Sequence, residues 1–161
     1  MRIQKIRKQK NKTDYKARMG MLKSGLTRVV VRKTNKYINI QLIESKDAKD
    51  KILSSLSSRD LLKYGISKDI KGSLKSIPSA YLTGYLAGKK FSGKYKGKLI
   101  LDVGLNRNIH GNRIYATLKG IVDSGAKIDY NEKVFPKEER IKGNHLKEGI
   151  KEVFEKIKGE G

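Results

Sequence analysis

Two runs of β-branched residues, on either side of a short polar segment, restrict the fold of this chain more than any other stretch of it. They lie within residues 28–42. β-branched side chains favour the pleated, half-buried surface of a strand. We therefore predict a β-hairpin here, with a two-residue turn at Thr34 and Asn35 that would place Arg32 opposite Tyr37.

The predicted hairpin has one apolar face and one polar face, because successive side chains of a strand point to opposite sides. The apolar face would consist of Val29, Val31, Ile38, Ile40 and Leu42. The polar face would present Arg28, Arg32, Tyr37, Asn39 and Gln41. Guanidinium, phenol and amide groups suit RNA phosphates and unstacked bases. The alternative is a solvated hairpin with ordinary surface arginines, and these residues alone do not decide between the two.

The overall charge favours a polyanionic partner. The 161 residues include 38 Lys and Arg against 16 Asp and Glu, a formal net charge of +22. So large a charge destabilises a compact chain by self-repulsion unless a polyanion neutralises it. The candidates are nucleic acid, an anionic membrane and an acidic protein. Residues 1–36 hold 13 of the cationic side chains and a single acidic one, Asp14, so the excess is concentrated in the N-terminal part and the hairpin.

We interpret residues 1–26 as a basic RNA-binding arm. Residues 1–12 contain too few apolar side chains to fold alone, so we expect them to be disordered in the free protein. Helical spacing of apolar residues predicts a short helix over 14–22, which Gly25 ends. The apolar residues of the arm are too few and too scattered for an amphipathic membrane anchor, so nucleic acid is the stronger interpretation.

Several classes of protein are disfavoured by what the sequence lacks. The absence of cysteine excludes disulfides and thiolate zinc sites. No apolar run approaches the roughly 18 residues that span a bilayer, and residues 1–12 do not resemble a signal peptide. We therefore expect a soluble intracellular protein that needs no cofactor, contacts no membrane and takes no small-molecule substrate.

The remainder of the chain predicts an α/β core over residues 27–130. Residues 46–63 have no strong period and are interpreted as a short helix followed by a loop or strand. Pro78 opens a clear helix in which Ala80, Gly84 and Gly88 form a flat seam suited to close approach to a sheet. A strand over 98–105 and a helix over 113–124 follow, and this alternation of elements indicates an α/β layer.

Residues 131–161 are interpreted as a C-terminal extension. It would comprise a charged loop over 133–143 and a helix over 144–158. The apolar stripe of that helix consists of Leu146, Ile150, Val153, Phe154 and Ile157. We expect this stripe to pack on the domain's own surface rather than in a partner's groove.

A catalytic role is the weakest alternative. Asp102, Asp123 and Asp129 could hold Mg²⁺ in a nuclease-like fold, but nothing in their spacing brings the three together. Asp102 more often forms a turn at the end of a strand. His110 and His145 have no ligand partner at useful spacing, so no metal site is predicted. We expect that the chain is not an enzyme.

Five segments, taken together and in order, resemble one protein family. They are Thr13-Asp14-Tyr15, Leu22-Lys23-Ser24-Gly25, Val31-Arg32-Lys33-Thr34-Asn35-Lys36, Pro78-Ser79-Ala80-Tyr81-Leu82-Thr83-Gly84 and Leu101-Asp102-Val103-Gly104-Leu105. The chain resembles the archaeal form of large-subunit ribosomal protein eighteen, a family that binds 5S rRNA. The resemblance implies a compact mixed-sheet α/β sandwich with helices packed on the sheet, a basic N-terminal extension and added C-terminal sequence.

The resemblance also implies partners and a location. The arm and hairpin would grip 5S rRNA and help to hold it to the large-subunit rRNA in the central protuberance of the cytoplasmic ribosome, beside neighbouring large-subunit ribosomal proteins. The arm is rich in Lys rather than Arg, which keeps the charge but weakens any expectation of bidentate contacts there. The predicted RNA-binding residues are Arg7, Lys8, Lys12, Tyr15, Arg18, Lys23, Arg28, Arg32, Lys33, Thr34, Asn35, Lys36, Tyr37, Asn39 and Gln41.

Overall fold

The computed structural model describes residues 10, 13–47, 49–65, 73–143, 154, 155 and 157. Its helices are α2 (Tyr15–Lys23), α3 (Ile77–Ser92), α4 (Arg113–Asp123) and α5 (Glu138–Lys142). Its strands are β1 (Thr27–Lys33), β2 (Ile38–Lys46), β3 (Lys49–Ser57) and β4 (Leu99–Asp102). Short 3-10 helices span Ser58–Tyr64, Ser73–Lys75 and Glu132–Val134. The disorder expected for residues 1–12, residue 10 excepted, and most of the helix expected over 144–158 lie outside the described residues.

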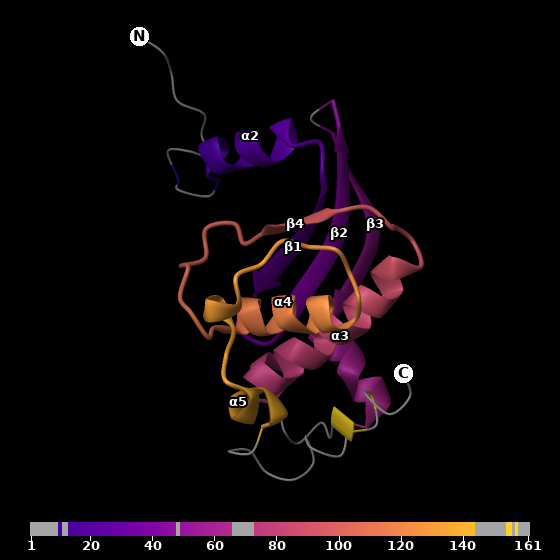
Figure 1. The fold of residues 1–161 in the computed structure, drawn as a ribbon, viewed down its shortest axis with the longest axis vertical. Coiled ribbons are helices and arrows are strands. Elements are labelled where there is room, and N and C mark those ends of the chain that lie inside the picture. The colour runs from indigo at the N-terminus through magenta and orange to yellow at the C-terminus, as the bar shows by residue number, and fades with distance from the viewer. Residues whose placement is uncertain are drawn as a thin grey trace.

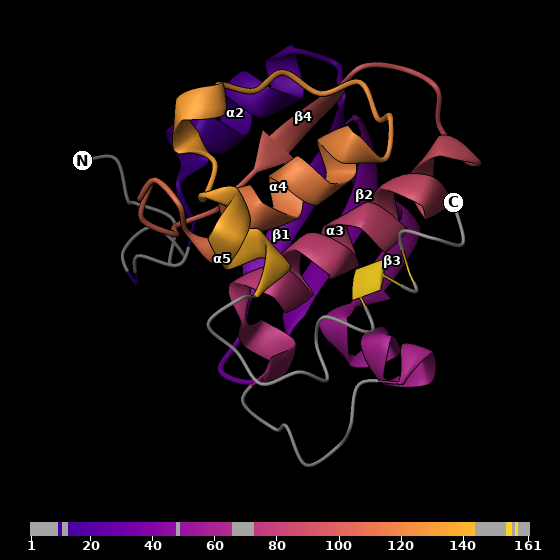
Figure 2. The same cartoon turned by 60° about the horizontal axis from the view of Figure 1, so that its bottom comes forward.

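The described strands form one mixed sheet in the order β3-β2-β1-β4. β1 is antiparallel to β2, and β2 is antiparallel to β3, whereas β4 pairs with β1 in parallel. α3 and α4 cover one face of this sheet (Figures 1 and 2). The parallel pairing requires a long crossover between β3 and β4, and α3 lies within it. The predicted α/β fold class is therefore confirmed.

The apolar face of the hairpin is confirmed, but the predicted register is wrong. Arg32 pairs with Asn39 instead of Tyr37. The hydroxyl of Thr34 accepts a hydrogen bond from the Tyr37 amide at 2.9 Å and donates one to the Tyr37 carbonyl at 2.8 Å. These bonds close a four-residue loop, so Tyr37 belongs to the loop and not to the polar strand face. A shift of two residues leaves the other side chains of the hairpin on their predicted faces.

The core lies between the sheet and the helix pair. Val29, Val31, Ile40 and Leu42 on the sheet's inner face are fully buried. Helix ends in this layer are capped by side chains: Ser76 accepts from the amide of Ser79 at the start of α3, and Asn112 accepts from the amides of Ile114 and Tyr115 at the start of α4. Caps of this kind fix where both helices begin.

Two local predictions need correction. Residues 46–63 begin with a strand, β3, and continue as a 3-10 helix, so the order of elements predicted there was wrong. β3 forms because β2 offers it a free edge, and the weak period of its own side chains did not reveal this pairing. The loop expected over 133–143 also contains the short helix α5.

The glycine seam of α3 packs on a helix and not on the sheet. A Cβ atom placed on Gly84 would overlap the carbonyl oxygen of Thr117 in α4. On the α4 side, a Cβ atom on Gly120 would overlap the carbonyl oxygen of Tyr81. The backbones of α3 and α4 therefore touch where they cross, which only glycine permits at these positions. The seam was predicted correctly, but its partner was not.

The two described apolar residues of the C-terminal stripe pack on the domain itself. The ring of Phe154 stacks on that of Tyr81 in α3, with the ring centroids 5.5 Å apart and 19° between the planes. Ile157 is 2% exposed. For these two residues the expected packing on the domain's own surface is confirmed. No helix in the described part of the chain has the length and apolar character needed to cross a bilayer.

We predict that Gly84→Ala destabilises the protein by about 1–3 kcal/mol, because the added methyl group forces the backbones of α3 and α4 apart. Urea unfolding followed by circular dichroism measures this change. Gly20→Ala in α2 is the matched control, because a Cβ atom there meets nothing within 4 Å. Alanine should stabilise that helix slightly. Equal effects of the two substitutions would contradict close packing at the crossing.

Candidate nucleic-acid interface

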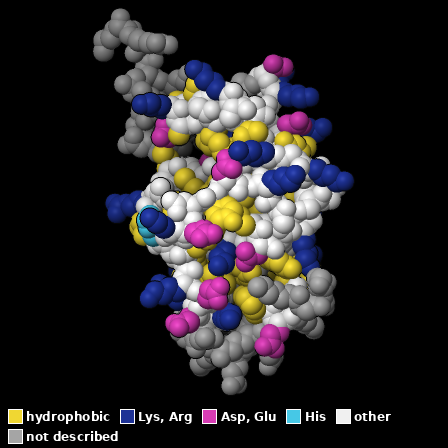
Figure 3. Space-filling model, viewed as in Figure 1, with side chains coloured by type: hydrophobic (Ala, Val, Ile, Leu, Met, Phe, Trp, Pro, Cys, Tyr) yellow, Lys and Arg dark blue, Asp and Glu magenta, His cyan; other side chains and the backbone are white. Residues whose placement is uncertain are grey.

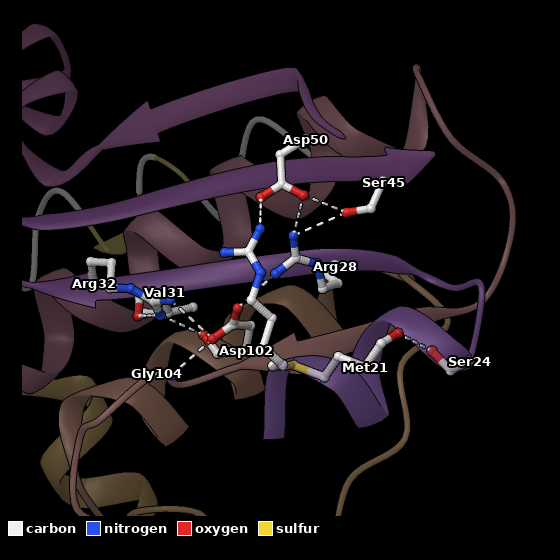
Figure 4. A network of polar contacts seen from close by, with 10 residues as sticks. Met21, Ser24, Arg28, Val31, Arg32, Ser45, Asp50, Asp102 and Gly104 are labelled. Carbon is white, nitrogen blue, oxygen red and sulfur yellow. Dashed lines mark hydrogen bonds and ion pairs between the residues drawn. The ribbon is translucent and has the colours of Figure 1, made fainter. Parts of the chain in front are cut away.

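A buried arginine lies at the centre of the sheet face that α3 and α4 leave uncovered. Arg28 is 3% exposed, and Figure 4 shows its guanidinium group between Asp50 and Asp102. Nη1 donates to Asp102 Oδ2 at 3.0 Å. Nη2 donates to Asp50 Oδ1 at 2.8 Å and to the Ser45 hydroxyl at 3.0 Å. The expectation that Arg28 presents its guanidinium group to solvent is therefore wrong.

Two further arginines bind the second oxygen of each carboxylate. Asp50 Oδ2 accepts from Nη2 of Arg18 in α2 at 2.8 Å. Asp102 Oδ1 accepts from Nη2 of Arg32 at 3.0 Å, and Nη1 of Arg32 donates to the Asp102 carbonyl at 2.9 Å. We call Arg18, Asp50, Arg28, Asp102 and Arg32 the arginine–carboxylate network. It joins α2 and strands β1, β3 and β4 in an alternating series of charges.

The network determines how its carboxylates titrate. Burial alone raises the pKa of the Asp50 carboxyl, but hydrogen bonds from Ser45 and Arg28 and the charges of Arg28 and Arg18 outweigh it and lower the pKa below 3.8. Removing one member of a buried ion pair typically costs about 3–5 kcal/mol, because the remaining charge is left uncompensated. The two carboxylates are thus needed to keep Arg28 inside the fold.

A groove of about 580 Å³ separates α2 from the end of β4. Arg18, Arg32, Met21 and Leu101 are among its lining residues. The side chains of Arg18 and Arg32 are 38% and 42% exposed, in contrast to Arg28. With three arginines and two aspartates, the network retains one positive charge, and its accessible part lies along this groove.

The hairpin tip presents a second group of predicted residues. Lys33, Thr34, Asn35 and Lys36 are all exposed, at the end of β1 opposite its junction with α2. The Thr34 hydrogen bonds to Tyr37 hold this loop closed. The tip is therefore a rigid polar projection with two free ammonium groups, since neither lysine forms an ion pair with another described residue.

The other predicted residues differ in accessibility. Tyr37 is half-buried and packs against the core. Asn39 and Gln41 are half-buried on the polar sheet face, where Asn39 accepts a hydrogen bond from the Ser57 hydroxyl at 2.9 Å. On α2, Tyr15 is half-buried and Lys23 is exposed. Arg7, Lys8 and Lys12 lie outside the described residues. The structure therefore brings the predicted residues together in two groups, one around α2 and one at the hairpin tip.

The three carboxylates of the nuclease alternative are separated. Asp102 belongs to the network, Asp123 accepts a hydrogen bond from the Tyr81 hydroxyl at 2.7 Å, and Asp129 pairs with Lys98 at 2.8 Å. Burial, and then the bond to Asp123, raise the pKa of Tyr81. Among the described residues, no three His, Asp or Glu side chains are placed to share a metal ion. The geometry offers no Mg²⁺ site in this part of the chain.

Sequence reasoning missed the role of Asp50 and understated that of Asp102. The turn function predicted for Asp102 is real, because its Oδ1 accepts from the Gly104 amide at 2.8 Å. The stronger signal was the isolated Arg28 within an otherwise apolar run, because a buried guanidinium group needs carboxylate partners. That signal predicts that partners exist but does not say which acids they are.

We predict that Asp50→Asn destabilises the protein near pH 7 and that this effect shrinks below about pH 4. A folded-state pKa below the unfolded value means that Asp50 stabilises the fold above the unfolded pKa and loses this contribution as the pH falls through the folded one. Urea unfolding of both proteins at several pH values measures the difference. Asp129→Asn, in an exposed ion pair, should change stability little at any pH. A pH-independent effect of Asp50→Asn would contradict the network.

Comparison of the sequence with known proteins identifies a family and several relatives. A family model described as ribosomal large subunit proteins 60S L5 and 50S L18 matches residues 1–99 and 92–131. The protein named large ribosomal subunit protein uL18 of Methanoculleus marisnigri is 44% identical over 88% of this chain and 79% of its own length. Its counterpart in Methanococcoides burtonii is 40% identical over 94% and 88%, and that of Korarchaeum cryptofilum is 39% identical over 96% and 75%.

These matches extend over nearly the whole chain, including the hairpin and β4. They agree with the resemblance seen in the five sequence segments, and the relatives named are archaeal ribosomal proteins rather than enzymes. On this basis the chain belongs to the family of ribosomal large subunit proteins that comprises 60S L5 and 50S L18.

Proposed function

We propose that this chain is a structural protein of the large ribosomal subunit that binds 5S rRNA and helps to anchor it to the large-subunit rRNA in the central protuberance. Its family membership supports the ribosomal role, since the relatives carry the name of a large-subunit protein. The observation that supports RNA contact is the hairpin tip, where Lys33 at the end of β1 and Asn35 and Lys36 in the loop closed by Thr34 are all exposed.

The cations of this interface divide into structural and available ones. Arg28 is itself buried and its guanidinium group is bound by the buried Asp102 and the partly exposed Asp50, so Arg28 supports the sheet and does not reach RNA. Arg18 and Arg32 keep exposed surface along the groove, and Lys33 and Lys36 are exposed at the tip. Phosphate contacts by such side chains release counterions, which favours binding at low salt.

The hairpin tip can also contribute selectivity. A rigid loop loses little conformational entropy on binding, so its hydrogen bonds to RNA are not offset by the cost of ordering. The Asn35 amide can donate to and accept from exposed base edges. Tyr37 is a weaker candidate for base stacking than the sequence implied, because its ring is half-buried against the core.

The division of labour follows from the domain boundaries that we propose. Residues 1–26 would serve as the RNA-binding arm, residues 27–130 as the rigid core, and residues 131–161 as an extension available to neighbouring ribosomal proteins. Residues 1–12 hold six Lys and Arg, including Arg7, Lys8 and Lys12. Each phosphate that they contact would add roughly 0.7–0.9 to the slope of log affinity against log salt. The arm would thus supply affinity and the hairpin tip selectivity.

A comparison at the two ends of β2 tests the proposal. We predict that Asn35→Ala combined with Lys36→Gln lowers affinity for 5S rRNA by roughly two- to tenfold, the value of one net hydrogen bond. The affinity of the same variant for an unrelated structured RNA of equal length should fall by less. Filter binding or fluorescence anisotropy with both RNAs measures the ratio.

Lys46→Gln is the matched control, because it removes one exposed cation from the opposite end of β2. It should lower the affinity for both RNAs slightly and to the same extent. If the hairpin-tip variant loses the same fraction of its affinity for both RNAs, recognition of 5S rRNA lies on another surface. If the unmodified protein shows no preference for 5S rRNA, the proposed function itself fails.

A further inference from the structure

We propose that a second surface of this chain, a cavity where α3 and α4 begin, binds the phosphate backbone of RNA. The cavity has a volume of about 620 Å³ and is lined by four cationic side chains, Lys33, Arg107, Arg113 and Arg140. No Asp or Glu among the described residues lines it. We call it the cationic cavity. The inference rests on the proposed RNA-binding function and extends it to residues that the sequence patterns did not single out.

The cations of this cavity are not neutralised by any other residue that the structure describes. None of the four side chains forms a hydrogen bond or ion pair with another residue in the described ranges. The contrast with the network is direct, because Arg18, Arg28 and Arg32 all contact carboxylates. Four like charges around one concavity repel each other, so an anion that enters it removes a cost that the free protein carries.

Arginine is concentrated here beyond its share of the sequence. The chain has 29 lysines but only nine arginines, and three of the nine line this cavity. A guanidinium group offers a planar fork of N–H donors that matches two oxygens of one phosphate, which an ammonium group does not. The composition of the lining therefore indicates phosphate recognition and not only general positive charge.

Helix ends add to the positive potential. Ser76 and Asn112, the caps of α3 and α4, both line the cavity, so two helices of 16 and 11 residues start at its wall. Neither helix has an acidic residue in its first turn. The N-terminal end of a helix carries a partial positive charge that favours anions. These ends reinforce the four side chains but would not make a site without them.

The position of the cavity favours RNA over an acidic protein. Lys33 belongs both to the hairpin tip and to the cavity, and the groove beside α2 shares Leu105 and Asn106 with it. An RNA strand on the hairpin tip would therefore reach the cavity without leaving basic surface. By contrast, Figure 3 shows acidic side chains interspersed among Lys and Arg over α4 and α5. Leu105 and Ile109 are 56% and 58% exposed, and they offer apolar surface to ribose and base faces.

The first experiment neutralises the cavity. The combined variant Arg107→Gln, Arg113→Gln and Arg140→Gln should flatten the slope of log affinity against log salt by about 2–3, at roughly 0.7–0.9 for each lost phosphate contact. The control combines Lys51→Gln, Arg59→Gln and Lys127→Gln, three exposed cations outside the cavity. Circular dichroism establishes that both variants fold. Equal slopes for the two variants would overturn the proposal.

A second experiment identifies the occupant directly. Because the chain has no cysteine, Ile109→Cys provides a single attachment point for a short photo-crosslinker at the cavity, and Arg59→Cys provides a control. Full-length labelled protein is assembled with 5S rRNA and into large ribosomal subunits. We expect RNA crosslinks from position 109 above the control. Sequencing of the crosslinked nucleotides tells 5S rRNA from large-subunit rRNA, and either supports the proposal.

Crosslinks to a ribosomal protein alone, or none above the control, would overturn the phosphate assignment. Such a result leaves the proposed function intact if the hairpin-tip variant still loses its preference for 5S rRNA. The proposed function can also fail while the proposal for the cationic cavity stands. If the unmodified protein shows no such preference but position 109 still crosslinks to large-subunit rRNA, the 5S assignment fails and the cationic cavity stands.

Discussion

A buried guanidinium group must be matched by carboxylates, and the polar face of this sheet depends on that match. Arg28 lies in β1, the strand between β2 and β4, and its partners Asp50 and Asp102 come from β3 and β4. One side chain thus fixes both outer strands to β1. Through Asp50, the same network holds Arg18 of α2. Because an unpaired charge inside the fold is so costly, the network favours a single arrangement of these elements.

This constraint separates the positive charges of the chain into two populations. Network arginines stabilise the fold, and their charges are largely cancelled by Asp50 and Asp102. The cations of the hairpin tip and the cationic cavity have no carboxylate partner in the described part of the chain. The formal charge of the chain is +22, and Arg28 is the only Lys or Arg that is buried among the described residues, so the other described cations lie where RNA phosphates can neutralise them.

Sequence patterns predicted what is local and missed what depends on distant partners. The hairpin faces were predicted because alternation of side chains survives a two-residue change of register. The length of the hairpin loop was not predicted, because it depends on a single hydroxyl group, that of Thr34. The partners of Arg28 lie 22 and 74 positions away, so no spacing rule finds them. The cationic cavity is harder still to predict, since its residues Lys33 and Arg140 come from β1 and α5 and are brought to one cavity only by the folded structure.

The most direct test of this account measures the stability and RNA affinity of Arg28→Lys together. Lysine keeps the charge but cannot reach both carboxylates and Ser45 with one ammonium group. The account predicts a loss of about 3 kcal/mol in the free energy of unfolding, while the folded variant, assayed at low temperature, keeps its affinity for 5S rRNA. An unchanged free energy of unfolding combined with weaker 5S rRNA binding would contradict it, because Arg28 would then contact the RNA instead of holding the sheet.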